Sequence, residues 1–387
     1  MQRASILAAV AGLSQFAFAS GANAADFTPT KFEAPPPAES AQIAEMVELT
    51  GKLLEQRYGA ASGETMARRA VHPKAHGCVK ADFTVNADLP EKYRIGVFAA
   101  PGKTYPAWIR YSNATAVLAP DVNDKKADSR GMAIKLMGVE GETLLGEPGG
   151  KTQDFLLINQ PMFAFPNVAE YDAFTRLQVE NKDNVRAFFP VFFDPKNPAR
   201  MKIFGIVTGV IQPTQLANPL DATYFSASPF LFGKDKAAKF AARPRNPANP
   251  SPTPDTPDKD YLRLAMKKSL AGGADPVLFD FQVQLRPDGL QPDDEAYPIE
   301  SANTEWKPKS DGTAAWQNVA VITIRPQDFD QPLQASECEH LVFTPWHGLV
   351  DHQPLGGINR LRREVYLASS KRRAQTSEPT GYPRWPM

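Results

Sequence analysis

The stretch RRAVHPKAHGCVKADFTV spans residues 68–85 and places two arginines, two histidines and a cysteine directly ahead of a strand. From Val79 to Val85, apolar and polar residues alternate, which is the period of a half-buried β-strand. Pro73 disfavours a helical conformation at the residue before it, so we expect His72 to enter the strand in an extended conformation. A histidine held in this way, three residues after Arg69, is a candidate functional group.

Other segments with strand character follow along the chain, at residues 106–113, 130–137, 154–159, 223–232, 276–285 and 317–325. Apolar residues at helical spacing predict an amphipathic helix over residues 39–59, and a second helical stretch covers residues 167–200. Many alternating strands with few helices between them favour an α+β fold. We expect an antiparallel sheet closed into a barrel, with helices packed outside it.

The amino-acid composition argues against some classes of function. The chain has 387 residues, of which 42% are hydrophobic and 22% charged, as is typical of a globular protein. Its 43 Lys+Arg balance its 43 Asp+Glu, so there is no basic excess to indicate a nucleic-acid partner. Beyond the N-terminus no apolar run is long enough to span a bilayer. Residues 243–258 hold six prolines and predict a long extended surface loop.

The N-terminus has the pattern of a secretory signal peptide over residues 1–24, with cleavage between Ala24 and Ala25. The mature chain is therefore expected to be periplasmic or secreted. Residues 25–38 then form an extended arm, and residues 377–387 a C-terminal tail. Export permits a disulfide, and the only two cysteines in the sequence are Cys78 and Cys338. The sequence leaves open whether these two are bonded or are two buried thiols.

Two familiar motifs are incomplete in this chain. GEPGGKT at residues 146–152 is similar to a phosphate-binding loop, but that loop needs a glycine where this chain has Leu145. His72, His76 and Cys78 are residue types that bind transition metals, but no further cysteine pair accompanies them, which argues against a zinc site.

Two groups of residues carry stronger signals. Arg110 and Ser112 are two apart in an extended run and point to the same side, and an arginine that faces a barrel interior needs an anionic partner. Near the C-terminus, Arg362 precedes Tyr366 by four residues and Arg373 follows it by seven. On a helix Arg362 can donate to the phenol oxygen, and a nearby cation favours a phenolate, which is a haem-iron ligand. The alternative is an ordinary charged helix with a buried tyrosine.

Taken together, these segments resemble the haem catalase family. Arg69-Ala70-Val71-His72 is similar to the segment R-x-V-H that holds the family's distal histidine, and Arg110-Tyr111-Ser112 is similar to its R-F-S strand. Residues 128–136 (DSRGMAIKL) are similar to D-P-R-G-F-A-V-K-F, and residues 159–163 (NQPMF) to N-x-P-I-F. The proximal R-x-x-x-Y falls on Arg362 and Tyr366. All the segments occur in the family's order between about residues 65 and 375.

The resemblance implies a catalase-like domain over residues 39–376, with haem b in a pocket beside the barrel. Tyr366 would be the axial ligand of the iron. His72 and Asn159 would act on the substrate, and Ser112 would orient His72. The residues that would contact the rest of the haem are Arg69, Arg110, Arg362, Arg373 and Phe165.

The implied activity is that of a haem-dependent peroxidase with some catalase activity, acting on hydrogen peroxide or small organic peroxides with an electron donor. The chain departs from the family pattern after both key residues, at 75–78 (AHGC) where a glycine-rich turn is usual and at 367–370 (LASS). Two alternatives remain open. One is rearrangement of fatty-acid hydroperoxides, as in the allene oxide synthase branch of the fold. The other is a non-catalytic haem-binding or haem-sensing protein, which would need neither Asn159 nor Ser112.

Overall fold

The computed structural model describes residues 28–59, 68–115, 118–122, 127–145, 151–247, 254 and 257–376. The helices are α1 Glu39–Tyr58, α2 Val168–Glu180, α3 Phe188–Phe192, α4 Pro198–Gly205, α5 Tyr261–Ser269, α6 Pro332–His340 and α7 Gly357–Thr376. The strands are β1 Ala75–Val85, β2 Thr104–Asn113, β3 Arg130–Met137, β4 Thr152–Ile158, β5 Tyr224–Phe225, β6 Phe230–Phe232, β7 Lys236–Pro244, β8 Val277–Leu285 and β9 Trp316–Ile324.

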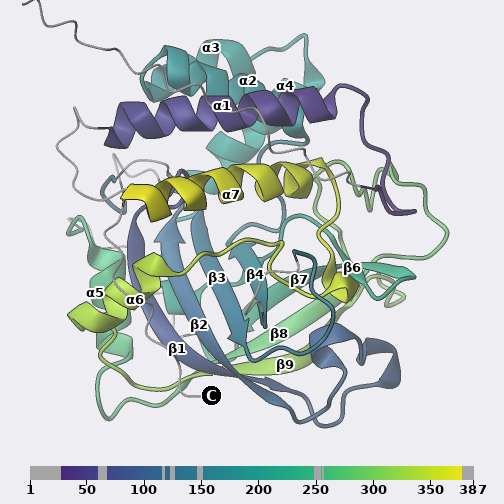
Figure 1. Cartoon of the computed structure of the whole chain (residues 1–387), viewed down its shortest axis with the longest axis vertical. Coiled ribbons are helices and arrows are strands. Elements are labelled where there is room, and N and C mark those ends of the chain that lie inside the picture. Colours follow the sequence, from purple (N-terminus) through teal and green to yellow (C-terminus); the bar gives the residue numbers. More distant parts are fainter. Residues whose placement is uncertain are drawn as a thin grey trace, which may run out of the picture.

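The strands form one antiparallel sheet that closes on itself (Figure 1). Their order is β5-β4-β3-β2-β1-β9-β8-β7-β6, and β5 pairs with β7 as well as with β4. Ile158 of β4 lies opposite Phe225, which in turn lies opposite Ala241 of β7. This double pairing closes the barrel, so the predicted α+β fold with an antiparallel barrel is confirmed.

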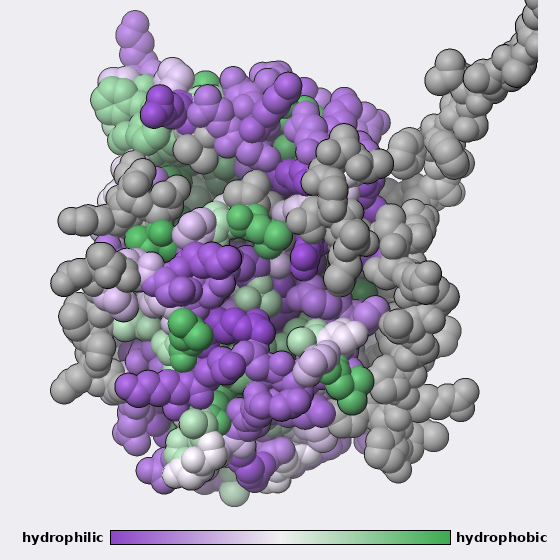
Figure 2. All heavy atoms as spheres, turned by 90° about the vertical axis from the view of Figure 1, so that its left-hand side faces the viewer, coloured by the Kyte–Doolittle hydropathy of each residue, from purple (hydrophilic) through white to green (hydrophobic). Residues whose placement is uncertain are grey.

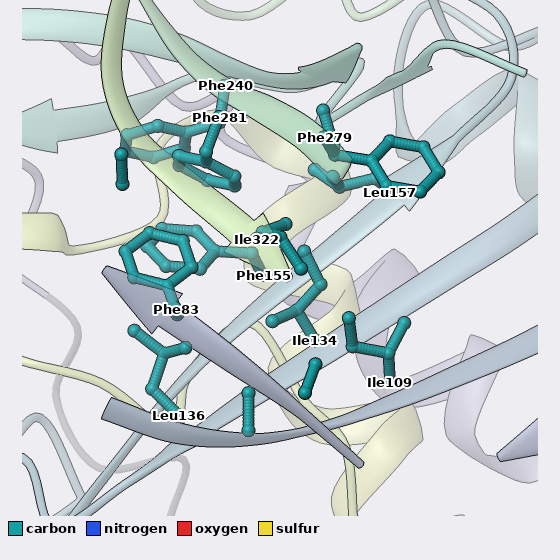
Figure 3. Close-up of a cluster of buried hydrophobic side chains, with 14 of the residues drawn as sticks. Phe83, Ile109, Ile134, Leu136, Phe155, Leu157, Phe240, Phe279, Phe281 and Ile322 are labelled. Carbon is teal, nitrogen blue, oxygen red and sulfur yellow. The ribbon is translucent and has the colours of Figure 1, made fainter. Parts of the chain in front are cut away.

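The barrel interior is filled by the inward-facing residues of every second position. On β1 these are Val79, Ala81, Phe83 and Val85, which confirms the alternation in the sequence. Aromatic rings meet at the centre: the centroid of Phe155 lies 4.8 Å from that of Phe281 and 4.9 Å from that of Phe240 (Figure 3). The interior is therefore a packed core, and a ligand has to bind outside it.

Helices cover one side of the barrel in successive layers. In Figure 1, α7 lies across β2 and β3, α1 lies beyond α7, and α2–α4 lie beyond α1. A shared apolar cluster joins α1, α2 and α7 through Met46, Leu49, Val168, Leu361 and Val365. The face that carries α5 and α6 is mainly hydrophilic, with apolar side chains in small separate groups over much of its area (Figure 2).

Cys78 and Cys338 form a disulfide, which settles the alternative that the sequence left open. The bond joins β1 to α6 across 260 residues of chain. Trp108 packs with the two cysteines, and Gln334 Nε2 donates to the Cys78 carbonyl at 2.9 Å. The C-terminal turn of α6 is thereby held against the outer side of the barrel.

Several local expectations were wrong. His72 is not extended but has φ +55°, in the left-handed region, and β1 begins three residues later. Pro73 disfavours the right-handed helical region, which usually gives an extended residue before it; His72 instead takes the rare left-handed conformation. The segment 223–232 is two short strands, because Ala227 at φ +58° turns the chain between β5 and β6.

Two other sequence assignments need correction. β7 was missed because its run KAAKFAARP is rich in alanine, which has low strand propensity; it also includes the first two residues of the expected proline-rich loop. The helical stretch 167–200 is three separate helices, α2–α4, and α5 and α6 were not foreseen. The predicted helix over residues 39–59 is confirmed as α1.

The predicted signal peptide at residues 1–24 and tail at 377–387 lie outside the described residues, as do half of the proline-rich loop and residues 146–150 of GEPGGKT. Within the described part of the chain, no helix combines the length and hydropathy that a bilayer span requires.

We predict that replacing both cysteines by serine lowers the free energy of unfolding by about 2–5 kcal/mol, because the bond closes a long loop in the unfolded chain. Denaturant titration of the oxidised protein and of the Cys78→Ser, Cys338→Ser variant measures this. Equal unfolding free energies would contradict a stabilising role for the bond.

Candidate functional site

A cavity lies on the outer side of the barrel, lined by residues of β2–β4 and α7. Seven of the nine predicted site residues line it although they come from three separate segments of the chain: Arg69, His72, Arg110, Ser112, Arg362, Tyr366 and Arg373. Apolar residues complete the lining, among them Leu156, Ile158, Val342 and Phe343. The structure thus joins the N-terminal and C-terminal motifs into one site.

His72 is held against β2 and β3. Its Nδ1 lies 3.0 Å from Ser112 Oγ, so Ser112 is placed to orient the ring as expected. Gly131 leaves the room for this contact: a Cβ at that position would lie 2.7 Å from the His72 ring and 2.9 Å from Ser112 Oγ. Glycine at residue 131 is therefore required by the position of the histidine, a signal that the sequence motif already contained.

The pKa of His72 is lowered to about 3, by burial and then by the positive charges of Arg110 and Arg362. The imidazole is therefore neutral across the physiological range and keeps a nitrogen lone pair. When Nδ1 donates to Ser112 Oγ, that lone pair is on Nε2, which can then accept a proton.

Arg110 does not face the barrel interior, contrary to expectation. Its neighbours Ile109 and Tyr111 belong to the barrel core, whereas Arg110 lines the cavity on the outer side. Its Nη2 donates to the Pro73 carbonyl at 3.2 Å, and its Nε is buried with no hydrogen-bond partner. A buried, unpaired guanidinium nitrogen beside a cavity favours an anionic ligand there.

Tyr366 and Arg362 both lie on α7 and face the cavity. The Arg362 guanidinium lies over the Tyr366 ring, 5.8 Å from its centroid, and its Nη1 donates to Asn359 Oδ1 at 3.3 Å. The sequence predicted a hydrogen bond to the phenol oxygen, and the structure has a stacked cation in its place. The positive charge still lies close to the phenol group.

Glu339 is the residue that sequence reasoning missed. Its carboxylate contacts Arg69 at 2.5 Å and Arg110 at 3.6 Å, and its backbone carbonyl accepts from Arg373 at 2.7 Å. These charges hold the pKa of Glu339 at about 2, against a burial effect that raises it. It is the anionic partner that Arg110 needed, but it lies more than 200 residues away, and no local pattern marks it.

Asn159 and Phe165 do not line the cavity. Asn159 Oδ1 accepts from the Arg130 backbone N–H at 2.7 Å, which fixes the side chain at the end of β4 and leaves its amide nitrogen as the donor. The Phe165 ring packs against Phe174 in the aromatic cluster of α2–α4, at 5.0 Å between centroids.

The transition-metal site considered from the sequence is not formed. Cys78 is in the disulfide, and His76 is fully buried with its Nδ1 3.6 Å from Asp121 Oδ1. Among the described residues, no group of three or more His, Cys, Asp or Glu side chains is arranged to hold a metal ion.

Residues 40–195 match the family model of catalase. Over this segment, which is less than half of the chain, the protein is similar to the catalase family. Its fold is shared by solved catalases at low sequence identity, so that similarity by itself shows the fold alone. No curated protein sequence matches the chain.

Three solved catalases illustrate the shared fold. A fungal catalase aligns with a TM-score of 0.61 at 14% identity, over 80% of this chain and 59% of its own. A bacterial catalase aligns with a TM-score of 0.55 at 16% identity, over 91% of this chain and 64% of its own. Catalase A from Saccharomyces cerevisiae aligns with a TM-score of 0.61 at 15% identity, over 90% and 67%. The chain therefore spans about three fifths to two thirds of the length of these catalases.

The residues around the cavity fit a haem. Four arginines line it and no carboxylate does among the described lining residues, which suits a ligand with two propionates. Arg110 has a donor without a partner, and Tyr366 supplies the phenol oxygen that catalases use as iron ligand. The apolar lining from β4 and from residues 342–343 suits the porphyrin ring.

We predict that Gly131→Ala displaces the His72 ring, because the added Cβ would overlap it. Gly205→Ala is the matched control, since nothing lies within 4 Å of a Cβ at that helical position. The NMR signals of the His72 ring should shift in the first variant and remain unchanged in the second. Identical His72 signals in both variants would show that the close packing against β3 is not as described.

Proposed function

We propose that this protein is an exported haem-dependent peroxidase with modest catalase activity, which reduces hydrogen peroxide or small organic peroxides. The observation that carries the proposal is the single cavity lined by both His72 and Tyr366, with four arginines around it. A protein that only carries haem needs the tyrosine and the arginines, but it has no use for a neutral histidine oriented by a serine.

The cofactor would be haem b, which when bound supplies a ferric iron able to take up a peroxide oxygen. Tyr366 would be its axial ligand, and the positive charge of Arg362 over the ring favours the phenolate that binds iron. Arg69, Arg110 and Arg373 would pair with the propionates.

His72 would act as the general acid–base group. Its neutral Nε2 would accept the proton from one peroxide oxygen and return it to the other oxygen, which would then leave as water. The two electrons that this cleavage of the O–O bond requires would be supplied by the haem. Ser112, whose Oγ lies 3.0 Å from Nδ1, would hold the tautomer that this step requires. Asn159 directly follows Ile158 of the cavity lining but is not part of that lining itself; in the proposal its amide nitrogen would polarise the peroxide by donating a hydrogen bond once the site is loaded. Because the pKa of His72 is about 3, its basic form persists down to well below neutral pH.

We predict that Tyr366→Phe strongly reduces haem retention or changes the ferric absorption spectrum, because phenylalanine has no ligand atom. Tyr171→Phe is the control: Tyr171 packs in the same helical cluster but does not line the cavity. Haem content and visible spectra of the purified proteins measure the effect. An unaltered spectrum and haem content in Tyr366→Phe would remove the proximal assignment.

His72→Ala should keep its haem and lose most peroxide turnover, by about 10²–10⁴-fold, the usual contribution of general acid–base catalysis. Asn159→Ala should lose less, since the amide only polarises the substrate. Steady-state peroxide consumption at equal haem content compares the three proteins. Turnover at the wild-type rate in His72→Ala would favour a haem carrier over an enzyme.

Peroxidase and catalase activities are separated by their reductant: an added donor in the first, a second peroxide in the second. The altered residues 75–78 and 367–370 border the two key residues, so we expect modest oxygen evolution together with oxidation of a phenolic donor. Parallel measurement of both rates on haem-loaded protein tests this. Fast oxygen evolution without donor oxidation would make the protein a plain catalase. Conversion of a fatty-acid hydroperoxide without any donor would favour the rearranging enzyme.

A further inference from the structure

The arginines assigned to the propionates already have a carboxylate partner in the protein itself. Glu339 Oε2 lies 2.5 Å from Arg69 Nη1, and Glu339 Oε1 lies 3.6 Å from Arg110 Nη2. Arg69 and Arg110 line the cavity, whereas Glu339 reaches them from behind, from the C-terminal turn of α6. A ligand carboxylate that binds these two arginines therefore meets a negative charge that is already bound to them.

We infer that Glu339 is an internal carboxylate that holds Arg69 and Arg110 in the ligand-free protein and competes with the carboxylates of the incoming ligand. This rests on the proposed haem site, and it adds a residue that limits how tightly that site binds. Like charges placed side by side at a binding interface are costly, so the ligand either displaces the Glu339 side chain or binds more weakly beside it.

The displaced Glu339 side chain can rotate into a second cavity. Glu339 also lines this cavity, whose lining includes the acidic Asp260 and the cationic residues Arg68, Lys74, Lys259 and Arg263, of which Lys74 and Arg263 already pair with aspartates. The Glu339 side chain is 25% exposed, so it is not locked in by packing. A rotation toward the second cavity would take the carboxylate from one set of cations toward another.

The backbone around Glu339 is much less free to move. Cys338, its neighbour, is tied to β1 by the disulfide. Arg69 Nη2 donates to the Leu341 carbonyl at 2.9 Å, and Arg373 Nη1 donates to the Glu339 carbonyl at 2.7 Å. These bonds do not involve the carboxylate. Arg69 and Arg373 therefore remain anchored when the Glu339 side chain rotates away. Replacing the Glu339 carboxylate by a ligand carboxylate requires only this one side chain to move.

The inference predicts opposite effects of Glu339→Gln on stability and on binding. Without the carboxylate, the ligand-free protein keeps mutually repelling arginines and should have a lower melting temperature. Haem should bind roughly tenfold tighter, because its propionates no longer meet a like charge. A residue with a merely structural role would lower both quantities together.

The experiment measures haem affinity by absorbance titration and the melting temperature of the haem-free protein, for wild type and Glu339→Gln. Glu337→Gln is the matched control, since Glu337 is on the same helix but pairs with Lys80 at 4.0 Å, away from the arginines. A second probe, the dimethyl ester of haem, has no propionate charges. Its affinity should be the same in wild type and Glu339→Gln.

Tighter haem binding, unchanged ester binding and a lower melting temperature in Glu339→Gln alone would support the inference. Equal or weaker haem binding in Glu339→Gln would overturn it and leave the haem site intact. An equal gain for haem and its ester would also overturn it, because the effect would not depend on the carboxylates. Failure of wild type and of both variants to bind either probe would overturn the proposed function and the inference with it.

Discussion

The pairing of β5 with both β4 and β7 closes the sheet, and the position of the site follows from that closure. A closed antiparallel barrel of this size fills its interior with side chains, here with the rings of Phe83, Phe155, Phe240 and Phe281. Polar residues of β2 and β3 therefore point outward. The only way to bury them is to cover that outer face, and α7 does so, bringing Tyr366 to the same cavity as His72.

Charge is the second constraint on the site. Burying several arginines around one cavity is unfavourable unless anions neutralise them. The carboxylate of Glu339 neutralises part of this charge from behind, and main-chain carbonyls of the α6 C-terminus accept further hydrogen bonds. The remaining positive charge faces the cavity. An anionic cofactor fits this arrangement, which is why the same residues both support the haem assignment and make Glu339 a competitor.

The parts of the fold that could be predicted are those in which a local pattern decides the structure. Strict alternation in β1 and β8 requires one buried face, and the spacing of Arg362 and Tyr366 requires one helical turn between them. β7 escaped prediction because alanines carry little strand preference, and burial of the whole sheet decided its conformation. The left-handed φ of His72 goes with its contacts to Ser112 and Gly131, which come from distant strands and are not marked by any local pattern.

The functional site, like the fold, has a part that the sequence predicts and a part that it does not. Motif residues could be named from the sequence, but their partners could not, because Glu339 meets Arg69 only through the folding of α6 onto β1. Asn159 shows the same limit: its place on the chain was predictable, whereas the bond that directs its oxygen to Arg130 was not.

The central claim is that His72 and Tyr366 face the two sides of one bound haem. A crystal structure of the haem-loaded protein tests it most directly. The account predicts the iron bonded to Tyr366 Oη, His72 on the opposite face of the porphyrin, and the propionates among Arg69, Arg110 and Arg373. Haem bound through another residue, or bound outside this cavity, would contradict it.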